Sequence, residues 1–309
     1  KKPNEAILTR EYPAEGQKVL SQILAHALGF DLNAGAIAES AHPFTSGLGR
    51  GDTRFTTRYY PRELNVSVFG TLHESGHGLY DQGLPEEHWG TPRGESVSLG
   101  IHESQSRMWE NFVGRSRAFW EYALPIARGI FPKNLASVSV DEFTWAVNNV
   151  QPSFIRVEAD EATYNMHINL RFELEQKIIA GDLAVDDIPT AWNERFTEML
   201  GITPPNDAEG CLQDVHWSGG MFGYFPTYTL GNLYAAQFFE KAREDLGDLD
   251  EQFALGRFAP LLGWLRENIH AKGMVFRASD LVKEVTGKPL SHDPLVRHLR
   301  DKYSRLYGI

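Results

Sequence analysis

The stretch LHESGHGL, from Leu72 to Leu79, places two histidines and a glutamate within about one turn of a predicted helix. His73 and His77 are four residues apart, so an α-helix presents both imidazoles on one face, where they can bind a single metal ion. Glu74, beside them, is placed to take a proton from a water that the ion activates. Because this short pattern also arises by chance, it needs a third ligand before it predicts a site.

The third ligand should be a histidine or a carboxylate on a separate element that returns to the first helix. The segment SLGIHESQSRMWENFVG, residues 98–114, is predicted as such a helix, and a Gly/Pro-rich loop connects it to the motif. The number of residues between His77 and Glu103 is enough for the end of one helix, a connecting loop and the start of a second helix. Other carboxylates remain alternatives on spacing alone: Glu95, Asp81 and Glu110.

Two glycines inside the motif helix indicate close packing. Gly76 and Gly78 each cost about 1 kcal/mol relative to alanine in a helix interior. We therefore expect another segment of the chain to approach this helix closely, either at a functional site or in a tight helix–helix contact.

Composition excludes several classes of protein. The 309 residues carry a net charge of −11 and no basic stripe, so we expect no nucleic-acid partner. No apolar run is long enough to span a membrane, and the first residues lack the apolar stretch of a signal peptide, so we expect a cytoplasmic protein without a membrane partner. Cys211 is the only cysteine, which excludes a disulfide within the chain and a multi-cysteine zinc site. We interpret Cys211 as a packed thiol.

Helical periodicity dominates the chain, which predicts a mainly α protein. The predicted helices cover residues 15–30, 105–130, 141–149, 161–182, 188–200, 230–246, 251–270 and 279–286. DTRFTTRYY, residues 52–60, is rich in Thr and aromatic residues and predicts a short strand, which could pair with an extended substrate as an edge strand does. No linker divides the sequence, so we expect a single catalytic domain over residues 1–309.

Seven motifs in order give the chain a resemblance to the carboxypeptidase Taq family of metallocarboxypeptidases. They are HPF (42–44), DTRFT (52–56), HESGH (73–77), HESQ (102–105), IRVEAD (155–160), GCLQDVHW (210–217) and GYFPTYTLGN (223–232). The resemblance implies a helical zinc-peptidase fold of the gluzincin type, with a small β-sheet beside the active-site cleft. Family members are longer, so the resemblance also implies a chain shortened at its N-terminus, without the family's N-terminal helical segment.

The resemblance implies His73, His77 and Glu103 as the ligands of one divalent ion, zinc or alternatively cobalt, with Glu74 as the catalytic base. It implies release of single C-terminal residues from peptides with broad specificity, and a homodimer. Two other functions stay open: an oligopeptidase of similar fold that cleaves internally, and an inactive metal-binding scaffold.

The reaction also needs a donor to the oxyanion and an anchor for the substrate carboxylate. His216, Tyr224 and Tyr228 are the candidate donors, and the resemblance to related zinc peptidases favours His216 and Tyr228. By themselves, His216 could cap a helix and Tyr228 could be a buried aromatic residue.

For the anchor we select Arg156, because a guanidinium binds a carboxylate with two parallel hydrogen bonds. Arg54 and Arg58 in the predicted strand are competitors. His42 and Asp52 are expected to support the metal ligands from outside the coordination shell.

Overall fold

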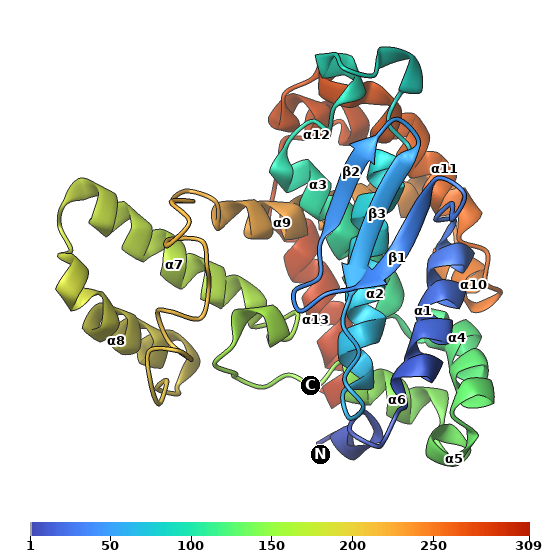
Figure 1. Cartoon of the computed structure of the whole chain (residues 1–309), viewed down its shortest axis with the longest axis horizontal. Helices are drawn as coiled ribbons and strands as arrows, with labels where there is room; N and C mark the ends of the chain where they lie inside the picture. Colours follow the sequence, from blue (N-terminus) through green and yellow to red (C-terminus); the bar gives the residue numbers. More distant parts are fainter. Residues whose placement is uncertain (1) are drawn as a thin grey trace. The chain divides into compact units, whose positions relative to one another are not determined.

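The computed structural model describes residues 2–309, which group into two compact units. Unit 1 comprises the chain up to Val147 together with Gly231–Ile309, and unit 2 comprises Asn148–Leu230. That the two units form one catalytic domain stays a prediction. The described chain is mainly helical with one small sheet, so the predicted fold class is confirmed (Figure 1). In this part of the chain, no helix combines the length and the apolar character that crossing a membrane requires.

Unit 1 holds the sheet and most of the helices. Its elements are α1 (Ala14–Leu28), β1 (Gly35–Glu39), β2 (Thr45–Gly49), β3 (Asp52–Thr57), α2 (Leu64–Asp81), α3 (Leu99–Arg107), a π-helical turn (Met108–Gly114), α4 (Arg117–Ile130), α5 (Pro132–Leu135), α6 (Val140–Val147), α10 (Leu249–Ala254), α11 (Ala259–Asn268), α12 (Ala278–Thr286) and α13 (Asp293–Tyr307). Unit 2 holds α7 (Tyr164–Ala180) and α8 (Ile188–Leu200). The helix α9 (Pro226–Leu246) begins in unit 2 and continues into unit 1.

The predicted strand exists, but it is the central strand of the sheet. The strand order is β1-β3-β2, with β3 parallel to β1 and antiparallel to β2. Both edges of β3 are therefore occupied by main-chain hydrogen bonds, and the prediction that this strand could pair with a substrate was wrong. Its alternating pattern buries Phe55 against Phe30, with ring centroids 5.0 Å apart. The sequence of β3 predicts a strand but not its place in the sheet. That place depends on β1 and β2, whose sequences contain Gly and Ala and give weak strand signals.

Two long predicted helices are interrupted. The segment predicted as 105–130 consists of the end of α3, the π-helical turn and α4, because Arg115 leaves helical geometry and the Ser116 side chain caps a new helix by accepting from Phe119 N–H. The segment predicted as 251–270 divides into α10 and α11 at Gly256, which has a φ of +70°. Sequence periodicity continues across both breaks, so it could not reveal them. The last helix, α13, was not predicted.

The close approach predicted at the two motif glycines is confirmed. A Cβ on Gly76 would lie 2.6 Å from the main chain of Gln105 and Ser106 in α3. A Cβ on Gly78 would lie 2.6 Å from the ring of Phe30. Since real side chains do not tolerate such distances, glycine at position 76 is what allows α3 to lie directly against α2.

Unit 2 has a small core of its own between α7 and α8. Its buried members are Leu170, Leu174, Trp192, Phe196, Leu200 and Cys211. Cys211 is thus a packed thiol, as expected, and burial raises its pKa. Beside this core, the fully buried His167 packs against Phe196, and neither of its ring nitrogens has a hydrogen-bond partner among residues 2–309.

The burial of His167 predicts that the protein loses stability in acid. Burial, together with the nearby Arg171 charge, lowers the His167 pKa from 6.5 to about 3. The folded pKa lies below the unfolded one, so the stabilisation is complete above pH 6.5 and is lost as the pH falls towards 3. In the parent protein, His167 should lower the free energy of unfolding by about 3 kcal/mol between pH 7 and pH 4. His167→Leu should remove that decrease, as measured by urea denaturation at the two pH values.

A matched control for this prediction is His292→Leu, at an exposed position. It should leave the pH dependence unchanged. An equal pH dependence in His167→Leu and the parent protein would show that His167 does not stay neutral in the folded unit.

Candidate functional site

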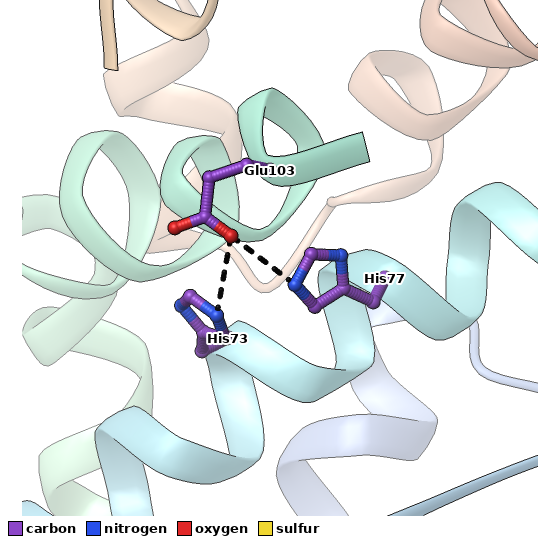
Figure 2. A group of neighbouring side chains, drawn as sticks. All are labelled: His73, His77 and Glu103. Atoms are coloured by element: carbon purple, nitrogen blue, oxygen red, sulfur yellow. Dashed lines mark ion pairs between the residues drawn. The ribbon is translucent and has the colours of Figure 1, made fainter. Parts of the chain in front are cut away.

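The helix α2 carries His73 and His77 one turn apart, with Glu74 next to His73. Both imidazoles are partly buried, their ring centroids are 5.0 Å apart, and their Nε2 atoms face the same carboxylate on α3. Figure 2 shows the two rings projecting from one helix towards Glu103 on its neighbour. Local helix geometry therefore fixes the two histidines, and the packing of α3 on α2 adds Glu103.

The donor atoms of these three residues fit a metal ion. They all lie within 4.8 Å of one another, and Glu103 Oε2 is 3.7 Å from His73 Nε2 and 3.3 Å from His77 Nε2. A tetrahedral zinc ion with bonds of about 2.1 Å separates its ligand atoms by roughly 3.4 Å. Two imidazole nitrogens and one carboxylate oxygen are also the donor types of catalytic zinc sites, which leave one position open.

Glu103 is held in place from both sides. On α3, Arg107 Nε donates to Glu103 Oε1 at 2.7 Å, which leaves Oε2 directed at the histidines. On α9, a Cβ at Gly231 would lie 2.4 Å from Glu103 Cγ, so this helix approaches the ligand as closely as a glycine permits. Burial raises the Glu103 pKa, but Arg107 and the two histidines outweigh it and hold that pKa far below its usual range. The carboxylate is therefore charged and ready to bind a cation.

The alternative carboxylates lie outside this group. Glu110 Oε2, on the π-helical turn, accepts from His73 Nδ1 at 2.9 Å; burial opposes its charge, but Arg107 and His73 lower its pKa to about 2. Asp81 bonds His102, and Glu95 is exposed. π-helical turns often occur at functional sites, and this one turns Glu110 towards His73.

The two histidines differ electrostatically. Burial lowers the His73 pKa, but Glu103 and Glu110 outweigh it and raise that pKa above its ordinary value. Burial lowers the His77 pKa, and His102 and His73 lower it further. The surroundings of the two rings differ, because the Glu110 carboxylate bonds the second nitrogen of His73, whereas the imidazole of His102 lies at the second nitrogen of His77.

Glu74 is 6% exposed and is positioned by the sheet. The Thr45 hydroxyl lies 2.7 Å from Glu74 Oε2 and 3.0 Å from the Glu74 carbonyl oxygen. Thr45 belongs to β2, whose register places it opposite Phe55 of β3. Sequence reasoning missed this contact, although Thr45 directly follows the HPF motif.

The predicted oxyanion donors lie together in unit 2. His216 Nε2 and Tyr228 Oη are 3.0 Å apart, and the Tyr224 ring centroid is 5.3 Å from that of His216. His216 is buried, and its ring packs against that of Phe225 at a centroid distance of 4.3 Å. The two tyrosines and the histidine thus form one cluster.

Arg156 is buried and already paired within unit 2. It is 3% exposed; its Nε and NH2 atoms donate to the Asp214 carboxylate, and NH1 donates to Tyr164 Oη. Arg171, fully buried on α7, donates to the same carboxylate from its Nε atom at 2.7 Å. Sequence reasoning missed Asp214, whose only signal was its place two residues before His216 in the QDVHW motif.

The other predicted residues lie on the surface of unit 1. Arg54 forms an exposed two-bond pair with Asp52, and His42 Nδ1 lies 2.9 Å from the Pro43 carbonyl oxygen. Among residues 2–309, neither Asp52 nor His42 bonds a member of the His–His–Glu group. The residues that do support this group are Glu110, Arg107 and His102. No contact among the described residues therefore supports the prediction that His42 and Asp52 hold the metal ligands in place.

Nearly the whole chain matches a known family. A family model described as Carboxypeptidase Taq (M32) metallopeptidase covers residues 1–303. The chain belongs to this family. Metallopeptidase membership and the His73, His77 and Glu103 donors together imply a bound divalent metal ion.

Curated proteins and solved structures resemble nearly the whole chain. It is 55% identical to thermostable carboxypeptidase 1 of Thermus thermophilus over 100% of this chain and 60% of that protein, and 44% identical to carboxypeptidase 1 of Bacillus subtilis over 99% and 61%. The crystal structure of an M32 carboxypeptidase from Deinococcus radiodurans has a TM-score of 0.98 at 42% identity, over 100% of this chain and 62% of that one. The chain thus spans about three fifths of the length of these relatives.

Proposed function

We propose that this chain acts as a zinc-dependent metallocarboxypeptidase that releases single C-terminal amino acids from peptides with broad specificity. The observation that carries the proposal is the His73, His77 and Glu103 donor group beside the buried Glu74, in a chain of the M32 family. The names of the relatives support the exopeptidase activity. Zinc is proposed because the donor types and separations suit its tetrahedral geometry, and cobalt is the alternative metal.

Each residue has a distinct part in the proposed reaction. His73, His77 and Glu103 would hold the ion, which when bound supplies Lewis acidity and lowers the pKa of water. Glu74 would accept a proton at its carboxylate as water attacks the scissile carbonyl, and would then deliver it to the leaving amine. The Thr45 hydroxyl orients that carboxylate through its 2.7 Å contact.

The substrate-binding assignments stay predictions. His216, Tyr228 and Tyr224 are the predicted donors to the oxyanion, and Arg156 and Arg54 are the predicted anchors of the C-terminal carboxylate. In the present arrangement, a substrate carboxylate at Arg156 competes with Asp214 for the guanidinium. Removing Arg156 would also unpair a buried cluster, so a change in substrate is a cleaner test than a change in Arg156.

The test compares a free-acid peptide with its C-terminally amidated twin. We expect the zinc-loaded protein to release one residue at a time from the free acid and to cleave the amide at least 100-fold more slowly, because the anchoring ion pair is absent. Mass spectrometry of the products measures both rates. Treatment with a chelator should abolish cleavage, and added zinc should restore it.

The other outcomes identify the rival functions. Equal cleavage of both peptides, or internal products, would indicate an oligopeptidase. Zinc binding without turnover of either peptide would indicate a metal-binding scaffold. The homodimer and the cytoplasmic location are further predictions, which mass measurement in solution and cell fractionation would check.

A further inference from the structure

The ring nitrogens of His73 and His77 that face away from Glu103 are held by different kinds of group. His73 Nδ1 bonds the Glu110 carboxylate directly. His77 Nδ1 lies 2.6 Å from Nδ1 of a third histidine, His102, and His102 Nε2 lies 3.0 Å from Asp81 Oδ1. The anion on the His77 side therefore acts through an intervening imidazole.

This chain of side chains is compact and shielded. Asp81 follows His77 by one turn on α2, while His102 reaches across from α3, next to Glu103 in the sequence. The His102 ring lies between the rings of His77 and Tyr80, at centroid distances of 4.7 and 5.1 Å. Each of the three polar side chains is about one fifth exposed or less. Packing in this layer leaves His102 little freedom to turn away.

A metal ion held at Nε2 of His77 would specify where the protons lie. Nε2 is the atom 3.3 Å from Glu103 Oε2, and a neutral imidazole that binds an ion there carries its proton on Nδ1. That N–H then donates to His102 Nδ1, which must be an unprotonated acceptor. In this arrangement the hydrogen of the His102 imidazole is on Nε2 and forms the hydrogen bond to Asp81. In the opposite arrangement, His102 Nδ1–H would donate to His77 and leave a proton on the ligand atom.

We propose that Asp81, acting through His102, is a positioning residue that selects the metal-binding tautomer of His77. The proposal rests on the metal site of the proposed function. A carboxylate can only accept a hydrogen bond, so Asp81 requires the proton of His102 to be on Nε2. Without that requirement, the hydrogen bond between the two histidines is satisfied equally well in either direction.

Asp81→Asn tests the proposal because it keeps the shape of the side chain but no longer requires the proton of His102 to be on Nε2. The asparagine amide can donate as well as accept, so it can present N–H to His102 Nε2 and reverse both hydrogen bonds. We expect the zinc dissociation constant, measured by competition with a chromophoric chelator, to rise 10- to 100-fold, the usual effect of losing such an outer partner. Nitrogen-15 NMR of the histidine rings in the zinc-free protein should show His77 shifting towards the Nε2–H tautomer, a change that a merely structural role would not produce.

Asp141→Asn is the matched control. It makes the same substitution in the same unit, at an exposed Asp that pairs with Arg117 and bonds no metal-site residue among those described. Zinc affinity should be unchanged there. An unchanged affinity and unchanged tautomer in Asp81→Asn as well would overturn the proposal.

His102→Phe provides a second, independent test. The phenyl ring keeps an aromatic side chain between His77 and Asp81 but has no nitrogen to relay a hydrogen bond, so Asp81→Asn should have no further effect on zinc affinity in this background. Additive effects would show that Asp81 acts by another route and would also overturn the proposal, even if the single Asp81 variant folds poorly. Zinc affinity does not depend on turnover, so a protein that cleaves no peptide can still support this inference, and an active one can still contradict it.

Discussion

Glu74→Gln is expected to lower kcat for the free-acid peptide by about 1,000-fold while zinc affinity stays within about threefold of the parent. The amide has the shape of the carboxylate and can still accept from Thr45, but it cannot take a proton from water. General-base catalysis typically contributes 10²- to 10⁴-fold, so loss of the base should dominate the result. Single-turnover hydrolysis and chelator competition measure the two quantities separately.

Glu95→Gln is the control for this substitution, since Glu95 is exposed and lies outside the donor group. Its kcat should equal that of the parent protein. A Glu74→Gln protein that retains most of the parental kcat would assign the base to another residue. Lost zinc affinity in the same variant would instead show that Glu74 stabilises the ion rather than the reaction.

Asp214→Asn should destabilise unit 2 by about 3–5 kcal/mol. Asp214 is the shared partner of Arg156 and Arg171, which are 3% and 0% exposed, and its loss leaves two buried guanidinium groups without their anion. Burial raises the Asp214 pKa, but Arg171 and Arg156 outweigh it and lower that pKa to about 2. Since this folded pKa lies below the ordinary value of 3.8, the stabilisation persists above pH 4 and is lost as the pH falls towards 2.

The control is an ion pair of the same length on the surface. Arg243 and Asp250 approach to 2.6 Å, as Arg156 and Asp214 do, but both side chains are at least 41% exposed. Asp250→Asn should cost no more than about 1 kcal/mol. Urea denaturation at pH 7 gives both values, and equal losses would refute the argument that burial makes the Asp214 pairs costly to break.

Local patterns predicted much of the helical part of the fold. Helix α7 and its end at Gly181 follow from a regular apolar repeat and a glycine stop, because both act within one or two turns. The central position of β3 could not be predicted in the same way. It depends on partners that precede it in the chain and on the crossover needed for the parallel pair with β1, neither of which the β3 residues encode.

At the candidate site, too, local sequence patterns predicted one part and tertiary packing decided the other. Helical spacing alone brings His73 and His77 to one face, and the costly glycines at 76 and 78 indicated that something packs closely there. Which carboxylate joins them depends on the contact of α3 with Gly76, a long-range packing event that spacing could not distinguish from the alternatives.

What the sequence by itself determined is the family, the mainly helical fold class and the HExxH group, because ordered motifs and residues four apart on a helix are local information. Only the tertiary structure decided that Thr45 contacts Glu74, that Asp214 pairs two buried arginines, and that Asp81 reaches His77 through His102. Each of these contacts joins residues from different elements. Buried polar groups must find such partners wherever the packed chain supplies them, and sequence distance carries no record of which partner that is.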